Sequence, residues 1–513
     1  DEGQSWKIIS PDLTRNDPNK LGSSGGPITK DNTGVEYYCT IFAAVESYHD
    51  EGVIWTGSDD GLIHITLDGG ENWKNVTPHN MPEWMMINSI EINPFEKGGV
   101  YVAGTKYKSG DFKPYLFMTT DYGATWKKIT NGISNNHFTR VVRADPKRNG
   151  LLYAGTETGI YVSFDNGTNW KSFQQNLPVV PITDLAIKDN NLIAATQGRS
   201  FWIIDDLTVL HQLNPNIEKQ AFHLYKPMKA YRMGGGDGLK SKTEGTNHPG
   251  GVLVHYFVKD TNQSDTISIS FKEIDGELIK TYSTHFDTES NESKLIVKPG
   301  LNQFSWNMRY QGVKTFPGMI LWAVDTLGPK AIPGKYLVEL KINKEVMTKE
   351  FDIVPDPRKS ASQEDLKSQF DFLIKVRDQL SAANQGVIDI RAIKPQIDDL
   401  SKKMDSEHKD IIKLISKINN DLKNIEETLY QTQNESGQDP LNFPIRLNNK
   451  MGYLGSIMAV GDNKPTDQSL KFYSEISAEI DTELMKLEKI KTEDLEALNK
   501  LISNKNIRAI TTE

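Results

Sequence analysis

The sequence predicts a mainly β chain of 513 residues that ends in a helical domain. An eight-residue pattern, Ser/Thr-x-Asp-x-Gly-x-x-Trp, recurs between residues 66 and 170. Apolar and polar residues then alternate between residues 252 and 354, which is typical of strands, and beyond residue 360 apolar residues recur at a helical period. We therefore expect β-propeller blades at residues 1–215, an immunoglobulin-like β-sandwich at 216–358 and an α-helical hairpin or bundle at 359–513.

The eight-residue pattern is the Asp-box, and it is complete at residues 66–73, 119–126 and 163–170. Its Asp can accept backbone N–H groups of a tight turn, and its Gly tolerates a backbone angle that other residues resist. Its Trp can fold back to pack between strands. We interpret six box residues as structural rather than catalytic, namely Asp68, Trp73, Asp121, Trp126, Asp165 and Trp170.

The boxes belong to a longer repeat. The tryptophan of each box and Trp6, which ends a partial box, are separated by 67, 53 and 44 residues. A repeated unit of four short strands and about 45 residues is the pattern of a propeller blade. We predict four blades at roughly 37–77, 86–130, 137–174 and 181–213, and a leading strand from Ser5 to Ile9.

A propeller is a closed ring, so four blades and a leading strand predict part of a larger, seven-bladed ring. We expect the other blades to come from an N-terminal propeller half of the same gene product or from a separate chain. A ring closed by four blades alone is the less favoured alternative, because it would leave the leading strand without a partner.

The alternating region predicts seven strands, at 252–258, 267–271, 277–281, 294–297, 302–308, 335–342 and 346–354. Turn dipeptides such as Asp275-Gly276 and Pro333-Gly334 separate them, which favours a β-sandwich. Beyond the sandwich, apolar stripes at residues 366–380, 411–429, 447–458 and 472–487 predict helices packed in a hairpin or small bundle.

Composition excludes several classes of function. The net charge of -9 argues against a nucleic-acid-binding protein, because there is no basic excess to meet phosphates. The single cysteine, Cys39, excludes an internal disulfide, and no run of 18 apolar residues predicts a membrane span. We expect no cofactor. The pairs Asp31-Asn32 and Asp165-Asn166 offer oxygen ligands for a structural calcium ion, with a solvated turn as the preferred interpretation.

Several further segments resemble a family of large bacterial Asp-box (BNR) repeat proteins, labelled glycosyl hydrolase or sortilin/VPS10-like. The matching segments are residues 10–14, 80–84, 150–159, 194–207, 306–310, 328–329 and 333–336. Relatives usually carry Thr-His-Gly-Arg where this chain has Thr-Gln-Gly-Arg at residues 196–199. The resemblance covers the whole chain. It implies the C-terminal half of a bacterial protein that has two propellers and lies outside the cytoplasm, in the periplasm, at the cell surface or secreted.

Two functions follow as hypotheses. The favoured one is a recognition or scaffold protein that binds a peptide or a glycan through propeller loops. The alternative is a glycoside hydrolase that acts on a polysaccharide in a cleft between two propellers, as tandem-propeller xyloglucanases do. One of its two catalytic carboxylates would then lie outside this chain. A sialidase is disfavoured, because its characteristic Arg-Ile-Pro motif is missing and no Tyr–Glu pair stands out.

The ligand-binding candidates are loop and strand-end residues of the predicted blades. Trp84 can stack on a sugar or peptide side chain, or pack structurally. Arg199 can line the central channel, or pair with Asp205 or Asp206. The other candidates are Arg143 in a strand, Glu157 in a turn, and the pair Asp59 and Asp60. For each carboxylate the structural alternative is a turn cap.

Overall fold

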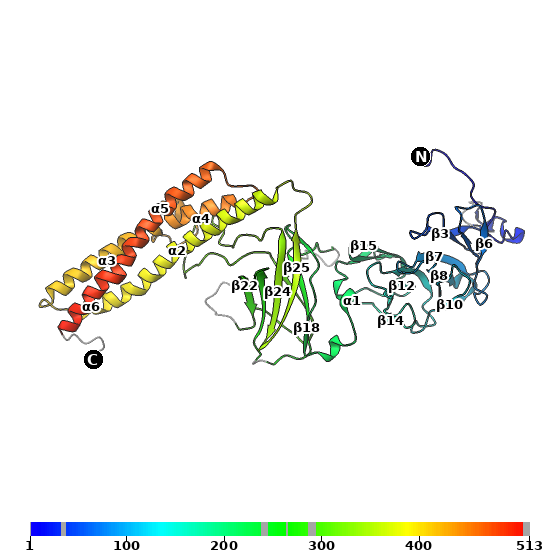
Figure 1. Cartoon of the computed structure of the whole chain (residues 1–513), viewed down its shortest axis with the longest axis horizontal. Coiled ribbons are helices and arrows are strands. Elements are labelled where there is room, and N and C mark those ends of the chain that lie inside the picture. The colour runs from blue at the N-terminus through cyan, green and yellow to red at the C-terminus, as the bar shows by residue number, and fades with distance from the viewer. Residues whose placement is uncertain (1, 32–36, 237–244, 263–264, 286–293, 506–513) are drawn as a thin grey trace. The chain divides into compact units, whose positions relative to one another are not determined.

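The computed structural model describes residues 2–31, 37–236, 245–262, 265–285 and 294–505 (Figure 1). It divides into two compact units, Asp1–Leu213 and Asn214–Glu513. The first unit contains the predicted blades. The second contains both the predicted sandwich and the predicted helices. The division into three domains therefore stays a prediction.

The first unit is built from four antiparallel sheets in which strand order follows chain order. The first sheet is β3 (Ile41–Glu46), β4 (Ile54–Ser58), β5 (Ile63–Thr66) and β6 (Trp73–Asn75); the second is β7 (Met86–Ile92), β8 (Val100–Lys106), β9 (Asp111–Thr119) and β10 (Lys127–Lys128). The third is β11 (Thr139–Ala144), β12 (Leu152–Thr156), β13 (Ile160–Ser163) and β14 (Lys171–Ser172); the fourth is β15 (Ile182–Lys188), β16 (Asn191–Thr196) and β17 (Phe201–Ile204). The first strands of consecutive sheets contact one another, as the inner strands of propeller blades do.

Shorter elements flank the sheets. They are a 3₁₀ turn at Pro18–Lys20, the two-stranded pair β1 (Ser24–Gly25) and β2 (Lys30–Asp31), a 3₁₀ turn at Tyr107–Ser109, and α1 (Thr208–Gln212). The predicted leading strand is wrong: residues 5–9 form no strand. The physical reason is that the ladder hydrogen bonds of a strand need a neighbouring strand, and no strand pairs with these residues.

Each complete Asp-box forms the same turn. In the second box, the Asp121 carboxylate accepts the backbone N–H of Thr125 at 2.8 Å and the hydroxyl of Thr119 at 2.8 Å. The Thr119 hydroxyl oxygen in turn accepts the N–H of Gly123 at 3.1 Å. Asp68 and Asp165 make the corresponding bonds in their boxes. The box aspartates therefore hold turns together.

The box tryptophans join each sheet to the chain before it. The indole of Trp126 donates to the carbonyl of Val76 at 2.7 Å, and that of Trp170 donates to Ile129 at 2.7 Å. Val76 and Ile129 each follow the last strand of the preceding sheet. Trp73 makes the same bond, at 2.8 Å, to Ile9. Ile9 thus lies where the end of a preceding blade's last strand would lie.

The second unit begins with a sandwich of two sheets. One has the order β18 (Phe222–Leu224), β20 (Val252–Val258), β23 (Gly300–Trp306); the other has the order β19 (Ala230–Tyr231), β25 (Glu345–Val354), β24 (Gly334–Ile342), β21 (Ile267–Glu273), β22 (Leu278–Ser283). In the core between them, the Trp306 ring stacks on Phe271 with centroids 4.3 Å apart. The strand predicted at 294–297 is wrong, because this segment forms no ladder and Leu295 only donates its N–H to Ser283.

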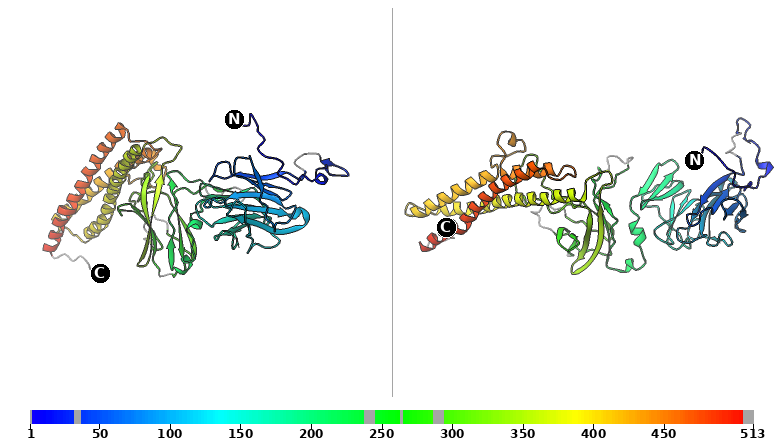
Figure 2. Two further views of the ribbon diagram at one scale, coloured as in Figure 1. Left: turned by 45° about the vertical axis from the view of Figure 1, so that its right-hand side comes forward. Right: turned by 45° about the horizontal axis from the view of Figure 1, so that its top comes forward.

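The helices follow the sandwich. They are α2 (Gln363–Lys402), α3 (Lys409–Leu429), α4 (Leu447–Met458), α5 (Asp467–Lys489) and α6 (Leu495–Asn504), with a 3₁₀ turn at Asp439–Leu441 and a π-helical turn at Ile490–Asp494. Helices α2, α3 and α5 run side by side in both views of Figure 2 and contact one another. Their apolar stripes form one core. In the part of the chain that the structure describes, no helix has the length and apolarity needed to cross a membrane.

Candidate functional site

A shallow pocket between the first two sheets brings together two of the predicted residues, Asp59 and Trp84. Its walls come from the loops that flank β3, β4, β7 and β8, and it is lined by Tyr38, Asp59, Trp84, Met86, Thr105, Lys106, Lys108 and Ser109. The enclosed space is about 10 Å³. This space holds no more than a group the size of a water molecule, so a ligand here would have to lie across the surface.

Two cations cover the indole ring of Trp84. The Arg15 guanidinium carbon lies 5.3 Å and the Lys20 amine 5.5 Å from the ring centroid. The Tyr38 ring meets the indole edge to face at 5.7 Å. Such contacts between cations and aromatic faces are attractive. Together with Lys106 and Lys108, they gather four cations at this surface, beside Asp59 and beside Glu83, whose carboxylate lies 3.9 Å from the Arg15 guanidinium.

The two adjacent aspartates hold two different backbone segments, the loop that carries Arg15 and the segment just before β3 at Thr40. Asp60 is fully buried; its carboxylate accepts the N–H of Arg15 at 2.6 Å, and its backbone carbonyl accepts the Arg15 Nε at 2.8 Å. Asp59 accepts the N–H of Thr40 at 2.9 Å, and burial raises its pKa. Both carboxylates thus have structural roles, but each accepts a backbone N–H that is distant in the chain rather than one of its own turn. Asp59 also faces the pocket.

Glu157 lies beside the loop that supplies the two lysines. Its carboxylate pairs with Arg140, with the Nη2–Oε2 distance at 2.6 Å. The Arg140 guanidinium carbon lies 5.2 Å from the centroid of the Phe138 ring, on which Tyr107 of the β8–β9 connection stacks at 4.9 Å. The ion pair therefore supports the loop that presents Lys106 and Lys108. Glu157 does not line the pocket.

Arg143 occupies a different place, on the inner strand β11. It donates to Asp184 at 2.7 Å and to the carbonyl of Leu185 at 2.7 Å on β15, and to the Ser89 hydroxyl at 2.8 Å on β7. A second carboxylate, that of Glu91, lies 3.6 Å from the guanidinium. Arg143 thus ties three consecutive inner strands together.

Sequence reasoning missed Glu91. Burial raises its pKa to about 7, although Arg143 acts in the opposite direction. No motif surrounds this residue. The only signal in the sequence was a charged side chain within a predicted inner strand of a blade. Glu91 and Asp184 flank one arginine on the inner strands of the sheets.

Arg199 joins neither group. It is exposed and donates to the carbonyl of Gly198 at 3.1 Å. Among the described residues it forms no ion pair with Asp205 or Asp206, so the first of its two alternatives, a structural ion pair, is not observed. The six candidates therefore do not converge on one site, and only Trp84 and Asp59 share a pocket.

Only part of the predicted calcium-binding residues can be described. Asn32 lies outside the described residues. At Asp165, both carboxylate oxygens accept hydrogen bonds within the Asp-box, from Ser163 and Asn169. In the described parts of the chain, no group of three or more His, Cys, Asp or Glu side chains is arranged to hold a metal ion.

No family model matches the chain. Among curated proteins, the xyloglucanase Xgh74A of Acetivibrio thermocellus is 25% identical over 146 residues, which are 24% of this chain and 17% of that protein. The chain thus matches less than a fifth of the length of that relative.

Two solved structures are similar to parts of the chain. YCF48 bound to D1 peptide is 19% identical, with a TM-score of 0.27 over 47% of this chain and 68% of that one. The GH74 xyloglucanase from Xanthomonas campestris is 12% identical, with a TM-score of 0.28 over 64% of this chain and 57% of that one. TM-scores this low support no inference about function.

Proposed function

We propose that this chain is a propeller-based recognition protein that binds an anionic peptide or glycan across the pocket at Trp84. The observation that carries the proposal is the clustering of two cations over the Trp84 ring, with two lysines in the pocket wall. The Trp84 ring holds Arg15 and Lys20 at this surface, and the cations attract carboxylates of a ligand. The carboxylates of Asp59 and Asp60 are engaged by the backbone N–H groups of Thr40 and Arg15, which favours binding over catalysis.

Binding measurements with two anionic polymers test this proposal. Poly-glutamate and polygalacturonate would be titrated into the full chain while tryptophan fluorescence is followed, with neutral xyloglucan as the third ligand. Replacing Lys106 and Lys108 together by Ala should weaken binding of an anionic ligand about tenfold, since each cation in such a site contributes of the order of 0.5–1 kcal/mol.

The control is the double substitution Lys127→Ala and Lys171→Ala, which removes two exposed lysines on β10 and β14. It should leave the affinity unchanged. Equal losses in both double variants would show that overall charge, rather than this pocket, governs binding. Absence of binding to either anionic polymer would contradict the proposal.

A second function, hydrolysis of a polysaccharide, has one observation in its favour. Glu91, with a pKa raised to about 7, lies with Asp184 on either side of Arg143. A carboxylic acid that is partly protonated near neutral pH can serve as a general acid. The matched curated relative is a xyloglucanase. Release of reducing ends from xyloglucan, abolished by Glu91→Gln, would favour this function over simple recognition.

We further propose that additional blades complete the ring and that the assembly lies outside the cytoplasm. Ile9 occupies the position that Val76 and Ile129 occupy at the next two boxes. Large apolar side chains on the first and last sheets are exposed to solvent: Phe42 is 48% exposed and Phe201 is 77% exposed. The location rests on the resemblance to exported bacterial Asp-box proteins. Intact-mass analysis of natively purified material should reveal Asp-box blades beyond these four, in the same or a second polypeptide.

A further inference from the structure

A cavity of about 380 Å³ lies within the second unit, where the sandwich meets the helices. Residues next to β19, β23 and β25 form one side, and residues of α2 and of the turn after α4 form the other. It is lined by Arg232, Met233, Gly234, Arg309, Lys330, Asp356, Arg358, Lys359, Gln369, Leu373, Ala459, Gly461 and Asp462. This volume is in the range of sites for small ligands.

Positive charge dominates the lining. The five cations are Arg232, Arg309, Lys330, Arg358 and Lys359, and the two carboxylates are Asp356 and Asp462. Asp462 accepts Arg232 at 2.5 Å and Lys359 at 2.8 Å, and Asp356 accepts Arg358 at 2.8 Å. The two carboxylates are thus already engaged by three of the cations.

The remaining two cations lack a carboxylate. Within the described residues, Arg309 and Lys330 form no ion pair, and their polar contacts are backbone carbonyls. Arg309 donates to Gly328 at 2.8 Å, and Lys330 donates to Met233 at 3.0 Å. Neutral carbonyls offset only part of the cost of removing a positive charge from water.

The environment of Lys330 reflects this shortage of negative charge. Burial, and then the nearby Arg232 and Arg309, lower its pKa to about 8; Lys359 acts in the same direction, and only Asp462 opposes them. Arg358, Asp356 and Gln369 are the other charged and polar groups in the lining. An anion would relieve the repulsion among these cations.

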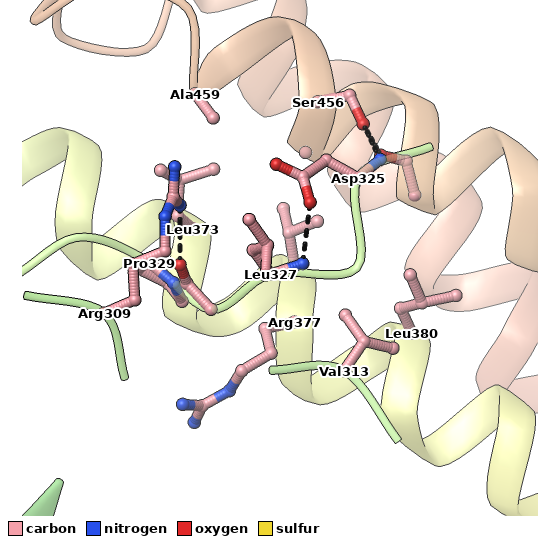
Figure 3. Close-up of a pocket in the computed structure, with 14 residues that line it drawn as sticks. Arg309, Val313, Asp325, Leu327, Pro329, Leu373, Arg377, Leu380, Ser456 and Ala459 are labelled. Carbon is pink, nitrogen blue, oxygen red and sulfur yellow. Dashed lines mark hydrogen bonds between the residues drawn. The ribbon is translucent and has the colours of Figure 1, made fainter. Parts of the chain in front are cut away.

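We propose that this cavity binds the oxyanion group of a small ligand, with Arg309 and Lys330 as its principal contacts. A guanidinium can bind two oxygens of one carboxylate, phosphate or sulfate group, and a lysine adds a point charge. Arg309, Leu373 and Ala459 also line an adjoining pocket of about 40 Å³ whose other walls include Val313 and Leu380 (Figure 3). A short apolar substituent on the ligand fits there.

Calorimetric titration of the full chain tests the site with three simple anions, inorganic phosphate, sulfate and acetate. We expect at least one to bind with millimolar affinity or better. Lys330→Met and Arg309→Gln should each weaken that binding at least tenfold. Tighter binding of phosphate and sulfate than of acetate would point to a phosphorylated or sulfated ligand, and the reverse order to a carboxylate.

Lys335→Gln is the matched control, because Lys335 is an exposed lysine of the same unit that pairs with Glu350 outside the cavity. It should bind anions as the unmodified chain does. Circular dichroism should confirm that Lys330→Met folds, as expected for removal of a poorly compensated buried charge. Equal weakening by the control, or no binding of any of the three anions, would overturn the proposal.

The affinity should also depend on pH in a defined direction. Lys330 attracts an anion only when protonated, so sulfate affinity should fall as the pH rises through about 8. Sulfate is the appropriate probe because its own charge does not change in this range. Lys330→Met should remove this fall. A fall of the same size in the variant would assign the titration to another group and contradict the role given to Lys330.

Discussion

At the scale of single residues, the Asp-box glycines show why the repeat tolerates so little change. A Cβ atom added to Gly123 would lie 2.7 Å from the Val76 Cβ, and one added to Gly167 would lie 2.6 Å from Ile129 Cδ1. At Gly70 it would lie 2.4 Å from the carbonyl oxygen of Ile9. Each glycine thus lets one box approach the chain that its tryptophan also contacts.

Gly123→Ala should therefore destabilise the first unit more than Gly110→Ala does. Both glycines have φ of +76° to +80°, but a Cβ at Gly110 meets nothing within 4 Å. The shared backbone strain costs about 1–2 kcal/mol, and the overlap with Val76 should add about 1–3 kcal/mol. Urea denaturation of the two variants measures the difference. Equal losses would show that backbone strain alone matters.

The box carboxylates should make the first unit sensitive to acid. Hydrogen bonds from the N–H and side chain of Asn72 lower the pKa of Asp68 to about 2, and those from Thr125 lower the pKa of Asp121. Because the folded-state pKa lies below the unfolded value of about 3.9, their stabilisation is present above that pH and is lost as the pH falls toward 2.

Urea midpoints measured between pH 5 and pH 2 should show this loss. Asp68→Asn should lower the midpoint at pH 5 and reduce its dependence on pH. The exposed Asp205 provides the control, since Asp205→Asn should change neither quantity. An unchanged pH dependence in Asp68→Asn would contradict the assignment.

At the scale of elements, caps and close packing explain the helices. Ser362 and Asp365 form a reciprocal capping box at the start of α2, in which the Ser362 hydroxyl accepts the N–H of Asp365 at 3.1 Å. The helix continues beyond the apolar stripe predicted at residues 366–380, because Ala383, Val387 and Ile390 are also buried. At Gly386 the missing side chain leaves room for Leu484 of α5.

Ser362→Ala should lower the free energy of unfolding of the second unit by about 1 kcal/mol, the usual cost of losing an N-cap. Ser416→Ala is the comparison, because Ser416 is an exposed residue within α3 whose hydroxyl bonds to the carbonyl of Ile412. Alanine favours a helix interior, so that variant should be neutral or slightly stabilised. Thermal melts followed at 222 nm (the usual helix wavelength) compare the two, and equal melting temperatures would contradict the capping role.

At the scale of the whole molecule, the chain consists of two compact units that share no core cluster: three clusters lie in the first unit and two in the second. We expect scanning calorimetry to resolve two transitions, one for each compact unit, since the two units have no core cluster in common. Gly123→Ala should lower one transition and Ser362→Ala the other. A single transition, lowered by both substitutions, would show that the units unfold as one.

The strand that sequence reasoning placed best is a nearly continuous apolar run with one histidine, His255. The range predicted for Val252–Val258 is the one observed, because one side of that strand faces the sandwich core along its whole length. The short strands β18 and β19 were missed, because two or three residues carry no periodicity. Residues 294–297 are apolar after Lys294 but form no strand.

The sequence by itself determined the blades and their boxes, because the Asp-box is a local device whose hydrogen bonds close within eight residues. It likewise determined the helices, whose stripes follow from a local period. Only the tertiary structure decided which side chains meet: Trp84 with Arg15, Glu91 with Arg143, and Arg309 with Lys330 in one cavity. These groups lie from 21 to 69 positions apart in the chain, and no local pattern reports contacts made by folding.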